Sequence, residues 1–517
     1  MNSRKPLGGF FIGAGCPGCG GELHLETDFF VTSCEHCGSI LRLILPRTPP
    51  AFMITARVLS HEIRMHIDRH LKQNDKSLTG GGLQIKRLYY PYWKIDARVL
   101  KLRNRTEVRK IAGEEDPQQD TVIQTNHSTV TVSPYLFTIA AGVRVDGVPE
   151  SLGMRSETVR LTPLDDERVA DDFDVLPVTR SMETIEQKLR RAVAALSSIS
   201  SADFGRNLTR LFNPSWSLVY FPYIIVDEYG GTYRRFVLDG LIGRVIKAAL
   251  PEQRRSRSLG LEQNRLGLHS GLTRVSSGDE PGDGLFEDTL AQGVVADLNA
   301  SDADLPDESE DASKMTFGRI EVDFHRCDYC GADLPGTPSY LYVCSNCHAV
   351  QMMDNTAVRL TKIDAVTAPV GGAVRMVPFW RLGLADDFVT RYGALLGGVD
   401  HCRALLIPAI KSGNYESLHK LARRMTTAQE RFTTATLETT DDRFLPVQIG
   451  LDEALALAET IVCRELLDHG LLLPDGDLEV APTEVGLVYV PFRSEGYFCV
   501  DSVLDAVSFE RVLVDQV

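Results

Sequence analysis

Two cysteine knuckles near the N-terminus decide how this chain is interpreted: Cys16-Pro17-Gly18-Cys19-Gly20 and Cys34-Glu35-His36-Cys37-Gly38. In each, Cys-x-x-Cys turns two thiolates toward one side of a tight loop, and 14 residues separate the two pairs. Such spacing is typical of a tetrahedral four-sulfur metal site. The pattern returns downstream with a gap of 13 residues, so the sequence predicts two four-cysteine ribbons with these ligands: Cys16, Cys19, Cys34, Cys37, Cys327, Cys330, Cys344 and Cys347.

We expect one structural Zn²⁺ in each ribbon. Four protein thiolates fill the coordination sphere and leave no position for water or substrate. A module of about 35 residues buries too little apolar surface to be stable alone, and bound zinc supplies stability. Disulfides and iron–sulfur ligation are the alternatives, disfavoured by the odd total of eleven cysteines and by the paired spacing. His36 and His348 adjoin ligands, and we expect them to face solvent or orient sulfur.

Beyond the cysteines the chain repeats its landmarks, and an internal repeat informs the fold more than local propensity does. Each copy has three proline-containing landmarks, and after the second of them come apolar residues at helical spacing, in residues 185–196 and 415–425. The matched landmarks are Tyr90-Pro91-Tyr92-Trp93 with Val377-Pro378-Phe379-Trp380, Leu176-Pro177-Val178 with Ile407-Pro408-Ala409, and Phe221-Pro222-Tyr223 with Val490-Pro491-Phe492.

The predicted fold class is α+β, with two related lobes on either side of a linker. Each lobe is a four-cysteine zinc ribbon followed by a small α+β domain with antiparallel strands and a core of its own. Proline within the predicted strands is expected on edge strands or at bulges. The predicted boundaries are ribbon 1, residues 10–46; domain 1, residues 50–251; an acidic disordered linker, residues 252–316; ribbon 2, residues 317–357; and domain 2, residues 358–517.

The net charge of −15 is concentrated in the linker. Between Val275 and Ser313 there are twelve acidic residues and no lysine or arginine, which leaves about −3 for the rest of the chain. Few apolar side chains and many charges predict disorder for this segment. Charged residues also interrupt every long apolar run, so the sequence predicts a protein that does not span the membrane and resides in the cytoplasm.

The ribbons themselves are acidic. Each contains four carboxylates against one or two arginines, and four thiolates on one Zn²⁺ add further negative charge. Nucleic-acid affinity depends largely on lysine and arginine at the phosphates. Ribbon charge therefore favours proteins, rather than nucleic acid, as partners.

One basic segment stands out, residues 86–110, where cations alternate with tyrosine and tryptophan. As a strand it would place its cations on shared faces. A half-buried strand with a solvated basic face is the favoured interpretation; contact with nucleic acid and contact with the linker or an acidic partner remain open. The candidate contact residues are Lys86, Arg87, Lys94, Arg98, Lys101, Arg103 and Arg105.

Catalytic motifs are missing from the sequence. The His61–His66 stretch fails the His-Glu-x-x-His zinc-protease spacing by one residue, and Gly80–Gly82 lacks the Gly-Lys-Ser/Thr of a phosphate loop. No Gly-x-Ser-x-Gly nucleophile motif occurs. We therefore expect a protein that is not an enzyme.

Together these landmarks resemble bacterial proteins in which a transcription-factor-IIB-type zinc ribbon is joined to an α+β domain of unknown function. The resemblance rests on Cys16–Gly20, on the two Pro-aromatic-Trp segments and on Ile407–Ala409; Val178 stands where the pattern has alanine. It implies zinc ribbons and little about mechanism. Our expectation is a zinc-ribbon adaptor or scaffold that mediates protein–protein interactions in a multiprotein assembly. The alternative is a nucleic-acid-associated factor that binds through residues 86–110.

Overall fold

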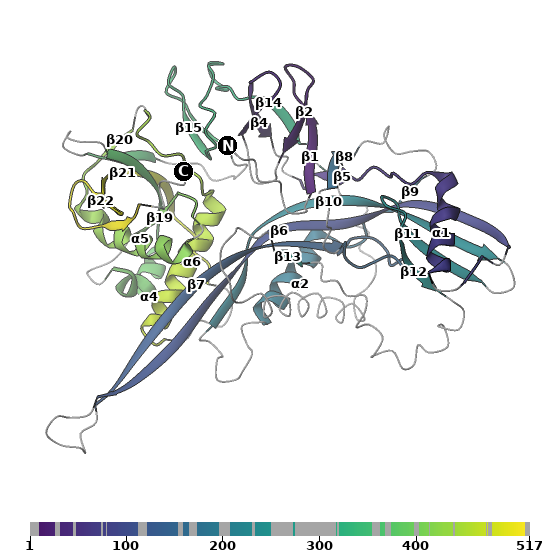
Figure 1. Cartoon of the computed structure of the whole chain (residues 1–517). Helices are drawn as coiled ribbons and strands as arrows, with labels where there is room; N and C mark the ends of the chain where they lie inside the picture. The colour runs from purple at the N-terminus through teal and green to yellow at the C-terminus, as the bar shows by residue number, and fades with distance from the viewer. Residues whose placement is uncertain are drawn as a thin grey trace.

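The computed structural model describes most of the two lobes and very little of the linker (Figure 1). Within residues 252–316 it describes only 272–274, a short strand, so the disorder expected for the remainder lies outside the described residues. The description covers residues 10–25, 31–44, 48–73, 76–78, 80–111, 121–152, 159–164, 173–195, 207–229, 233–249, 272–274, 317, 320–353, 362–367, 374–397, 403–412, 414–437, 440–471, 473 and 478–511.

Three long strands run through the centre of the molecule, with β6 between β7 and β10 and antiparallel pairing on both edges (Figure 1). Both faces of β6 are buried, with Trp93 and Ile95 on one and Leu100 and Leu102 on the other. A strand buried on both faces has a nearly continuous apolar sequence, which accounts for the run of aromatic residues at 89–93. The elements of lobe 1 are β5 (Ala51–Met53), η1 (Ser60–Glu62), α1 (Ile63–Lys72), β6 (Gly82–Ile111), β7 (Thr121–Ala140), β8 (Val159–Pro163), β9 (Asp174–Val175), α2 (Met182–Ala195), β10 (Asn207–Tyr229), β11 (Arg234–Asp239), β12 (Val245–Ala249) and β13 (Leu272–Arg274).

Lobe 2 has the same order of strands. The series β7-β6-β10-β5 in lobe 1 corresponds to β19-β18-β21-β17 in lobe 2, and β10-β11-β12 corresponds to β21-β22-β23. The predicted α+β class is confirmed, although the pairs β5–β10 and β17–β21 are parallel. The elements of lobe 2 are β17 (Lys362–Val366), β18 (Val374–Gly383), α4 (Asp386–Gly397), β19 (Ala404–Pro408), α5 (Tyr415–Ala428), η7 (Gln429–Arg431), β20 (Thr434–Thr436), α6 (Leu451–Asp468), β21 (Glu484–Glu495), β22 (Phe498–Asp501) and β23 (Ser508–Glu510).

Proline occurs in β6 and β10 at points where the neighbouring strand changes. Pro91 lies between the residues of β6 that pair with β9 and those that pair with β7. Its carbonyl accepts a hydrogen bond from the Ala141 N–H (2.9 Å), just beyond the end of β7. Pro222 lies between the parts of β10 that pair with β5 and with β11, and its carbonyl accepts from the Gly240 N–H (2.9 Å).

The two prolines in the central strands of lobe 2 accept equivalent hydrogen bonds. The carbonyl of Pro378 in β18 accepts from the Ala409 N–H, and that of Pro491 in β21 accepts from the Ser502 N–H, both at 2.9 Å. In a strand, the N–H and C=O of one residue point to the same side. Each missing donor therefore faces a seam between two neighbouring strands, so no ladder bond is lost. The expectation of edge strands or bulges was wrong, because these prolines lie in interior strands.

The register of the central strands also agrees between the lobes. Pro91 lies opposite Tyr220, and Pro378 lies opposite Tyr489. Two residues after each proline, a tryptophan lies opposite a leucine. Each indole N–H then donates to a backbone carbonyl two residues before a helix: Trp93 Nε1 to Arg180 O (2.9 Å) and Trp380 Nε1 to Ile449 O (2.8 Å).

One matched landmark from the sequence was wrong. The structural counterpart of Leu176-Pro177-Val178 is Leu445-Pro446-Val447, rather than Ile407-Pro408-Ala409. Each Leu-Pro-Val triplet leads into a helix that begins six residues after its leucine, α2 in lobe 1 and α6 in lobe 2. In lobe 2, helices α4 and α5 separate the triplet from the preceding landmark, which obscured the match. The equivalent hydrogen bonds are Leu176 N–H to Tyr89 O (3.0 Å) and Leu445 N–H to Met376 O (2.9 Å).

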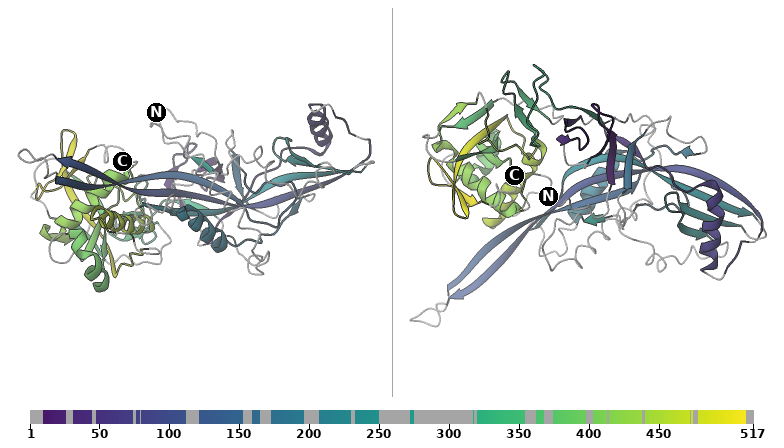
Figure 2. Two further views of the ribbon diagram at one scale, coloured as in Figure 1. Left: turned by 90° about the horizontal axis from the view of Figure 1, so that it is seen from below. Right: turned by 45° about the horizontal axis from the view of Figure 1, so that its top comes forward.

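The lobes do not have separate cores, contrary to expectation. Leu100 and Leu102 of β6 and Val130 of β7 belong to the same buried cluster as the interior of lobe 2. Helices α5 and α6 of lobe 2 pack against these long strands, as the views in Figures 1 and 2 show. The part of the β6–β7 hairpin that contains these residues thus forms one side of the hydrophobic core of lobe 2.

Charged groups join the two lobes at this contact. Arg98 of β6 donates to Tyr415 Oη on α5 (2.8 Å) and contacts the buried carboxylate of Glu453 on α6. Arg464 of α6 donates to Ser128 O on β7 (3.1 Å). Burial raises the pKa of Tyr415, so its hydroxyl stays protonated and can donate to Glu453 (3.3 Å). A buried carboxylate that loses its cation is strongly destabilising.

We predict that cutting the linker will not separate the lobes. In full-length protein with a protease site inserted at position 290, the two fragments should co-elute in size-exclusion chromatography after cleavage. The double variant Leu100→Asp/Leu102→Asp should release them, because two charges would enter the shared apolar cluster. Separate elution of the cleaved wild-type fragments would contradict the shared core.

Candidate metal centres

The first ribbon is built from two tight turns with glycine at the same place. The Gly20 N–H donates to Cys16 O (2.9 Å), and the Gly38 N–H donates to Cys34 O (2.8 Å). Both glycines have positive φ, 73° and 74°, a region that residues with a Cβ rarely adopt. The turns also aim amides at sulfur, as in Gly18 N–H to Cys16 Sγ (3.4 Å). The ribbon strands are β1 (Phe10–Gly15), β2 (Glu22–Leu25), β3 (Val31–Ser33), β4 (Ile40–Ile44), β14 (Glu321–Phe324), β15 (Leu341–Val343) and β16 (Val350–Met352).

The second ribbon differs at its last turn. Gly331 has φ 74°, like the glycines of ribbon 1, but the equivalent position after Cys347 is His348 with φ 58°. Its N–H still closes the turn by donating to Cys344 O (2.9 Å). An L-residue in this region costs about 1–2 kcal/mol relative to right-handed backbone. The turn hydrogen bond holds the histidine there.

Each set of four cysteines forms one compact group. The four Sγ atoms of Cys16, Cys19, Cys34 and Cys37 all lie within 4.8 Å of one another, and the second set has the same property. None of these cysteines forms a disulfide. A tetrahedral Zn²⁺ with bonds of about 2.3 Å separates its sulfurs by about 3.8 Å, so the donor sets fit zinc. The sulfur–sulfur distance is 3.7 Å for Cys16–Cys37 and Cys19–Cys34, and 3.6 Å for Cys327–Cys347 and Cys330–Cys344.

The neighbouring histidines lie outside both donor sets. His36 and His348 are exposed, and neither belongs to a metal-binding cluster of described residues. Cys463 and Cys499 are buried and form no disulfide, in keeping with use as small apolar residues. Cys402 lies outside the described residues.

The two ribbons share a sheet, a feature that the sequence did not predict. Strand β14 of ribbon 2 pairs antiparallel with β4 of ribbon 1 and extends the sheet to β14-β4-β3. Arg42 on β4 makes ion pairs with Asp328 (2.8 Å) and Asp323 (3.6 Å) of ribbon 2. Phe324 lies beside Gly18, where a Cβ would be 3.4 Å from its ring. The acidic side chains of ribbon 2 are therefore partly neutralised by a cation of ribbon 1.

A buried histidine lies at this junction. The His325 N–H donates to Ile40 O of ribbon 1 (3.0 Å), and its ring packs edge-on against Tyr342 at 4.6 Å. Burial, aided by the nearby Arg42 cation, lowers the pKa of His325 to about 4. The imidazole is thus neutral at pH 7 and serves as a packing group between the ribbons.

The structure separates the predicted basic residues instead of gathering them on one face. Lys94 is buried and contacts Asp96, while Arg98 reaches into lobe 2. Lys101 is also buried, and the Arg105 side chain lies outside the described part of the chain. Alternation alone could not reveal this, because lobe 2 packs against β6 around Leu100 and Leu102. Lys86 and Arg103 are exposed. Arg87 is half-buried and donates a hydrogen bond to Ser60 Oγ at the surface (2.6 Å).

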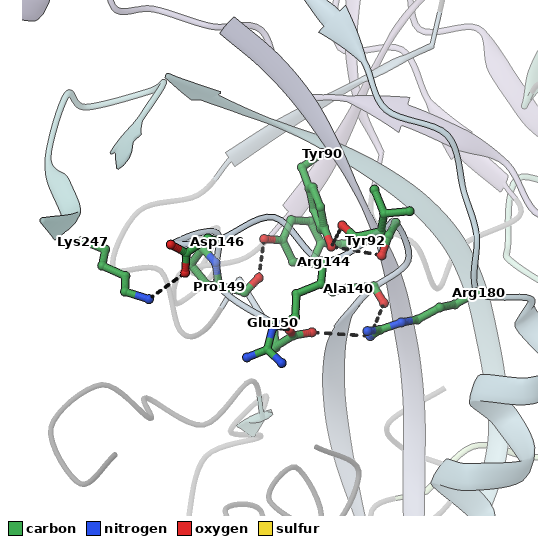
Figure 3. A network of polar contacts seen from close by, with 11 residues as sticks. Tyr90, Tyr92, Ala140, Arg144, Asp146, Pro149, Glu150, Arg180 and Lys247 are labelled. Carbon is green, nitrogen blue, oxygen red and sulfur yellow. Dashed lines mark hydrogen bonds and ion pairs between the residues drawn. The ribbon is translucent and has the colours of Figure 1, made fainter. Parts of the chain in front are cut away.

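A tyrosine network anchors the loop that follows β7 (Figure 3). Tyr92 Oη donates to Pro149 O (2.7 Å) and lies 2.9 Å from Tyr223 Oη; Tyr90 Oη donates to Val143 O (3.0 Å). Burial raises the pKa of Tyr92 well above its ordinary value, so this hydroxyl stays protonated. Its partners are a backbone carbonyl and a second phenol. This network holds a loop in place and offers no nucleophile.

Comparisons with protein-family models, with curated proteins and with solved structures return no match to this chain. The geometry of the cysteine sites is therefore the firmest basis for a functional proposal.

We predict two zinc ions per chain, released on denaturation in the presence of a colorimetric chelator. Cys37→Ser should remove the zinc of ribbon 1. It should also speed zinc loss from ribbon 2, because β14 would lose its partner strand. The matched control is Cys499→Ser, which alters a buried cysteine outside both sets and should keep two zinc ions. Unchanged release from ribbon 2 in Cys37→Ser would count against coupling of the ribbons.

We also predict that His348→Gly stabilises ribbon 2 by about 1 kcal/mol, because glycine adopts positive φ without a Cβ clash. Resistance to zinc removal by a chelator should rise. The mirror control, Gly331→Ala, places a Cβ at φ 74° and should lower resistance by a similar amount. If His348→Gly weakens ribbon 2, the histidine has a role beyond the turn.

Proposed function

We propose that this protein is an adaptor or scaffold that mediates protein–protein interactions in a multiprotein assembly, with two structural Zn²⁺ ions. The observation that carries the proposal is the pair of complete four-cysteine groups on coupled ribbons. A metal held by four thiolates has no free coordination position, so it would stabilise a recognition surface and take no part in turnover. Solvent-facing Tyr329, 74% exposed between two ligands of ribbon 2, is a suitable contact for a partner.

The two lobes, in this proposal, arose by internal duplication of a ribbon followed by an α+β domain. Supporting observations are the common strand order, the matched positions of four prolines and the equal registers of Trp93 and Trp380. Each copy then acquired its own additions, the long β6–β7 hairpin in lobe 1 and helices α4 and α5 in lobe 2. The same origin is compatible with the resemblance to transcription-factor-IIB-type ribbon proteins.

The nucleic-acid alternative loses its main support. It depended on one basic face along residues 86–110, and Lys94, Arg98 and Lys101 are instead buried or directed into lobe 2. Two exposed cations among its described candidates, Lys86 and Arg103, are 17 positions apart on β6. An adaptor that contacts proteins through the ribbons remains the better explanation.

The proposal is tested by quantitative affinity purification of full-length protein from its native host. Tyr329→Ala should reduce recovery of specific partner proteins about tenfold, since exposed aromatic anchors contribute strongly to protein interfaces. The matched control is Tyr497→Ala, which removes a tyrosine that is 90% exposed on the β21–β22 hairpin of lobe 2. Both variants should retain two zinc ions. Equal partner sets for wild type and Tyr329→Ala would contradict recognition through ribbon 2.

A further inference from the structure

Helix α1 lies at one end of the elongated molecule, opposite the end formed by lobe 2 (Figures 1 and 2). It belongs to a segment inserted between β5 and β6 of lobe 1. In lobe 2, residues 367–373 are all that separate the corresponding strands β17 and β18. The helix is thus an addition to lobe 1, projecting from the end of its sheet.

The two faces of α1 have different chemistry. Ile63, Ile67 and Leu71 are buried against the sheet of lobe 1. The opposite face is cationic and open to solvent, and none of its cations forms a salt bridge with another described residue. The cations of this face and of the flanking chain are Arg57, Arg64, Arg69, Lys72 and Lys76.

Nearby acids do not balance these cations. Glu62 is used as a cap, because its Oε2 accepts the Leu59 N–H (3.0 Å). Asp68 is half-buried and lines the same open patch of surface as Arg64 and Lys72. A local positive surface therefore remains on a chain whose net charge is −15.

Large aliphatic side chains project from the same end. Leu59 is 56% exposed, Met65 is 47% exposed and Ile242 is 57% exposed. Ile242 belongs to the turn between β11 and β12, which the Arg57 N–H joins through Gly240 O (3.0 Å). Met65 lines the open patch together with the cations. Cations and exposed aliphatic groups thus occupy one continuous tip, which we call the α1 tip: η1, α1, residues 57–59 and the turn 240–243.

We propose that the α1 tip binds the surface of an anionic lipid bilayer. Anionic headgroups attract lysine and arginine near the membrane, and the acyl boundary accepts protruding aliphatic side chains. A nucleic acid would match the cations but leave Leu59, Met65 and Ile242 in water. The patch is open to solvent, and Met65 lies in it beside Arg64 and Lys72. Lipid is therefore the partner that satisfies both kinds of group.

The elongated shape makes this contact possible for an acidic protein. Electrostatic repulsion between exposed charges is screened beyond about 8 Å at physiological salt. Lobe 2 and the paired ribbons lie well away from α1 along the molecule (Figure 1). The tip can therefore approach an anionic surface while the acidic groups of lobe 2 and of the ribbons stay at a distance (Figure 1). Attachment at this end would leave the ribbons free, so the inference does not depend on the proposed adaptor function.

The test is sedimentation of full-length protein with vesicles of phosphatidylcholine, with and without phosphatidylserine. Wild type should bind only the serine-containing vesicles and should be released at high salt. Arg64→Glu/Arg69→Glu/Lys72→Glu should weaken binding at least about 100-fold, given roughly fivefold per cation. Leu59→Ser/Met65→Ser/Ile242→Ser should weaken it about tenfold or more, because the aliphatic groups would no longer be buried.

Matched controls separate a specific tip from net charge. Arg375→Glu/Arg403→Glu/Arg431→Glu makes the same charge change on exposed residues of lobe 2 and should bind like wild type. All variants should keep two zinc ions and a common thermal transition. Three results would overturn the proposal: no vesicle binding by wild type, equal loss in the lobe 2 variant, or binding to duplex DNA without binding to vesicles. The last would assign the tip to nucleic acid.

Discussion

The arrangement of both lobes depends on the long antiparallel pairing of β6 with β10 and of β18 with β21. It depends equally on four prolines within these strands, because proline has no backbone N–H. A proline inside a sheet is tolerated only where no neighbour needs its missing donor. Each of these prolines lies where one neighbouring strand ends and the next begins: Pro91, Pro222, Pro378 and Pro491. The carbonyl of each proline accepts a hydrogen bond from the first residue after the end of a neighbouring strand. These positions fix where loops depart and so where ribbons, helices and hairpins attach.

In the proposed function, zinc and the sheet would have complementary roles in the ribbons. A bound metal would replace the hydrophobic core that a short module cannot build. Strand pairing between β4 and β14, with Arg42 between Asp323 and Asp328, then converts two modules into one body. Because residues distant in the chain meet there, we expect a change at one metal centre to affect the other. Such a rigid pair suits a recognition surface better than two ribbons on separate tethers.

The β6–β7 hairpin shows why charge patterns need tertiary context. Alternation along 86–110 suggested a basic face, and the residues do lie on a strand. Lobe 2 packs against part of that strand, however, and Arg98 contacts Glu453 and Tyr415 of lobe 2. Within the described residues of lobe 1, a cluster of exposed cations without salt bridges lies on α1 instead. Lobe 2 does not pack against this helix. A charge is available for binding only when the folded chain leaves it unmatched.

By itself the sequence determined what depends on local chemistry. Cysteine spacing predicted both four-sulfur groups, and Gly20 and Gly38 indicated their turns, because ligands and turn residues lie close along the chain. The Pro-aromatic-Trp segments indicated the repeat for the same reason. Tertiary structure decided the correct partner of Leu176–Val178, the shared core around Leu102 and the pairing of the ribbons. These features depend on register and on contacts between segments hundreds of residues apart. The free energy of such contacts comes from burying two surfaces against each other. Neither segment alone has a sequence periodicity that would reveal its partner.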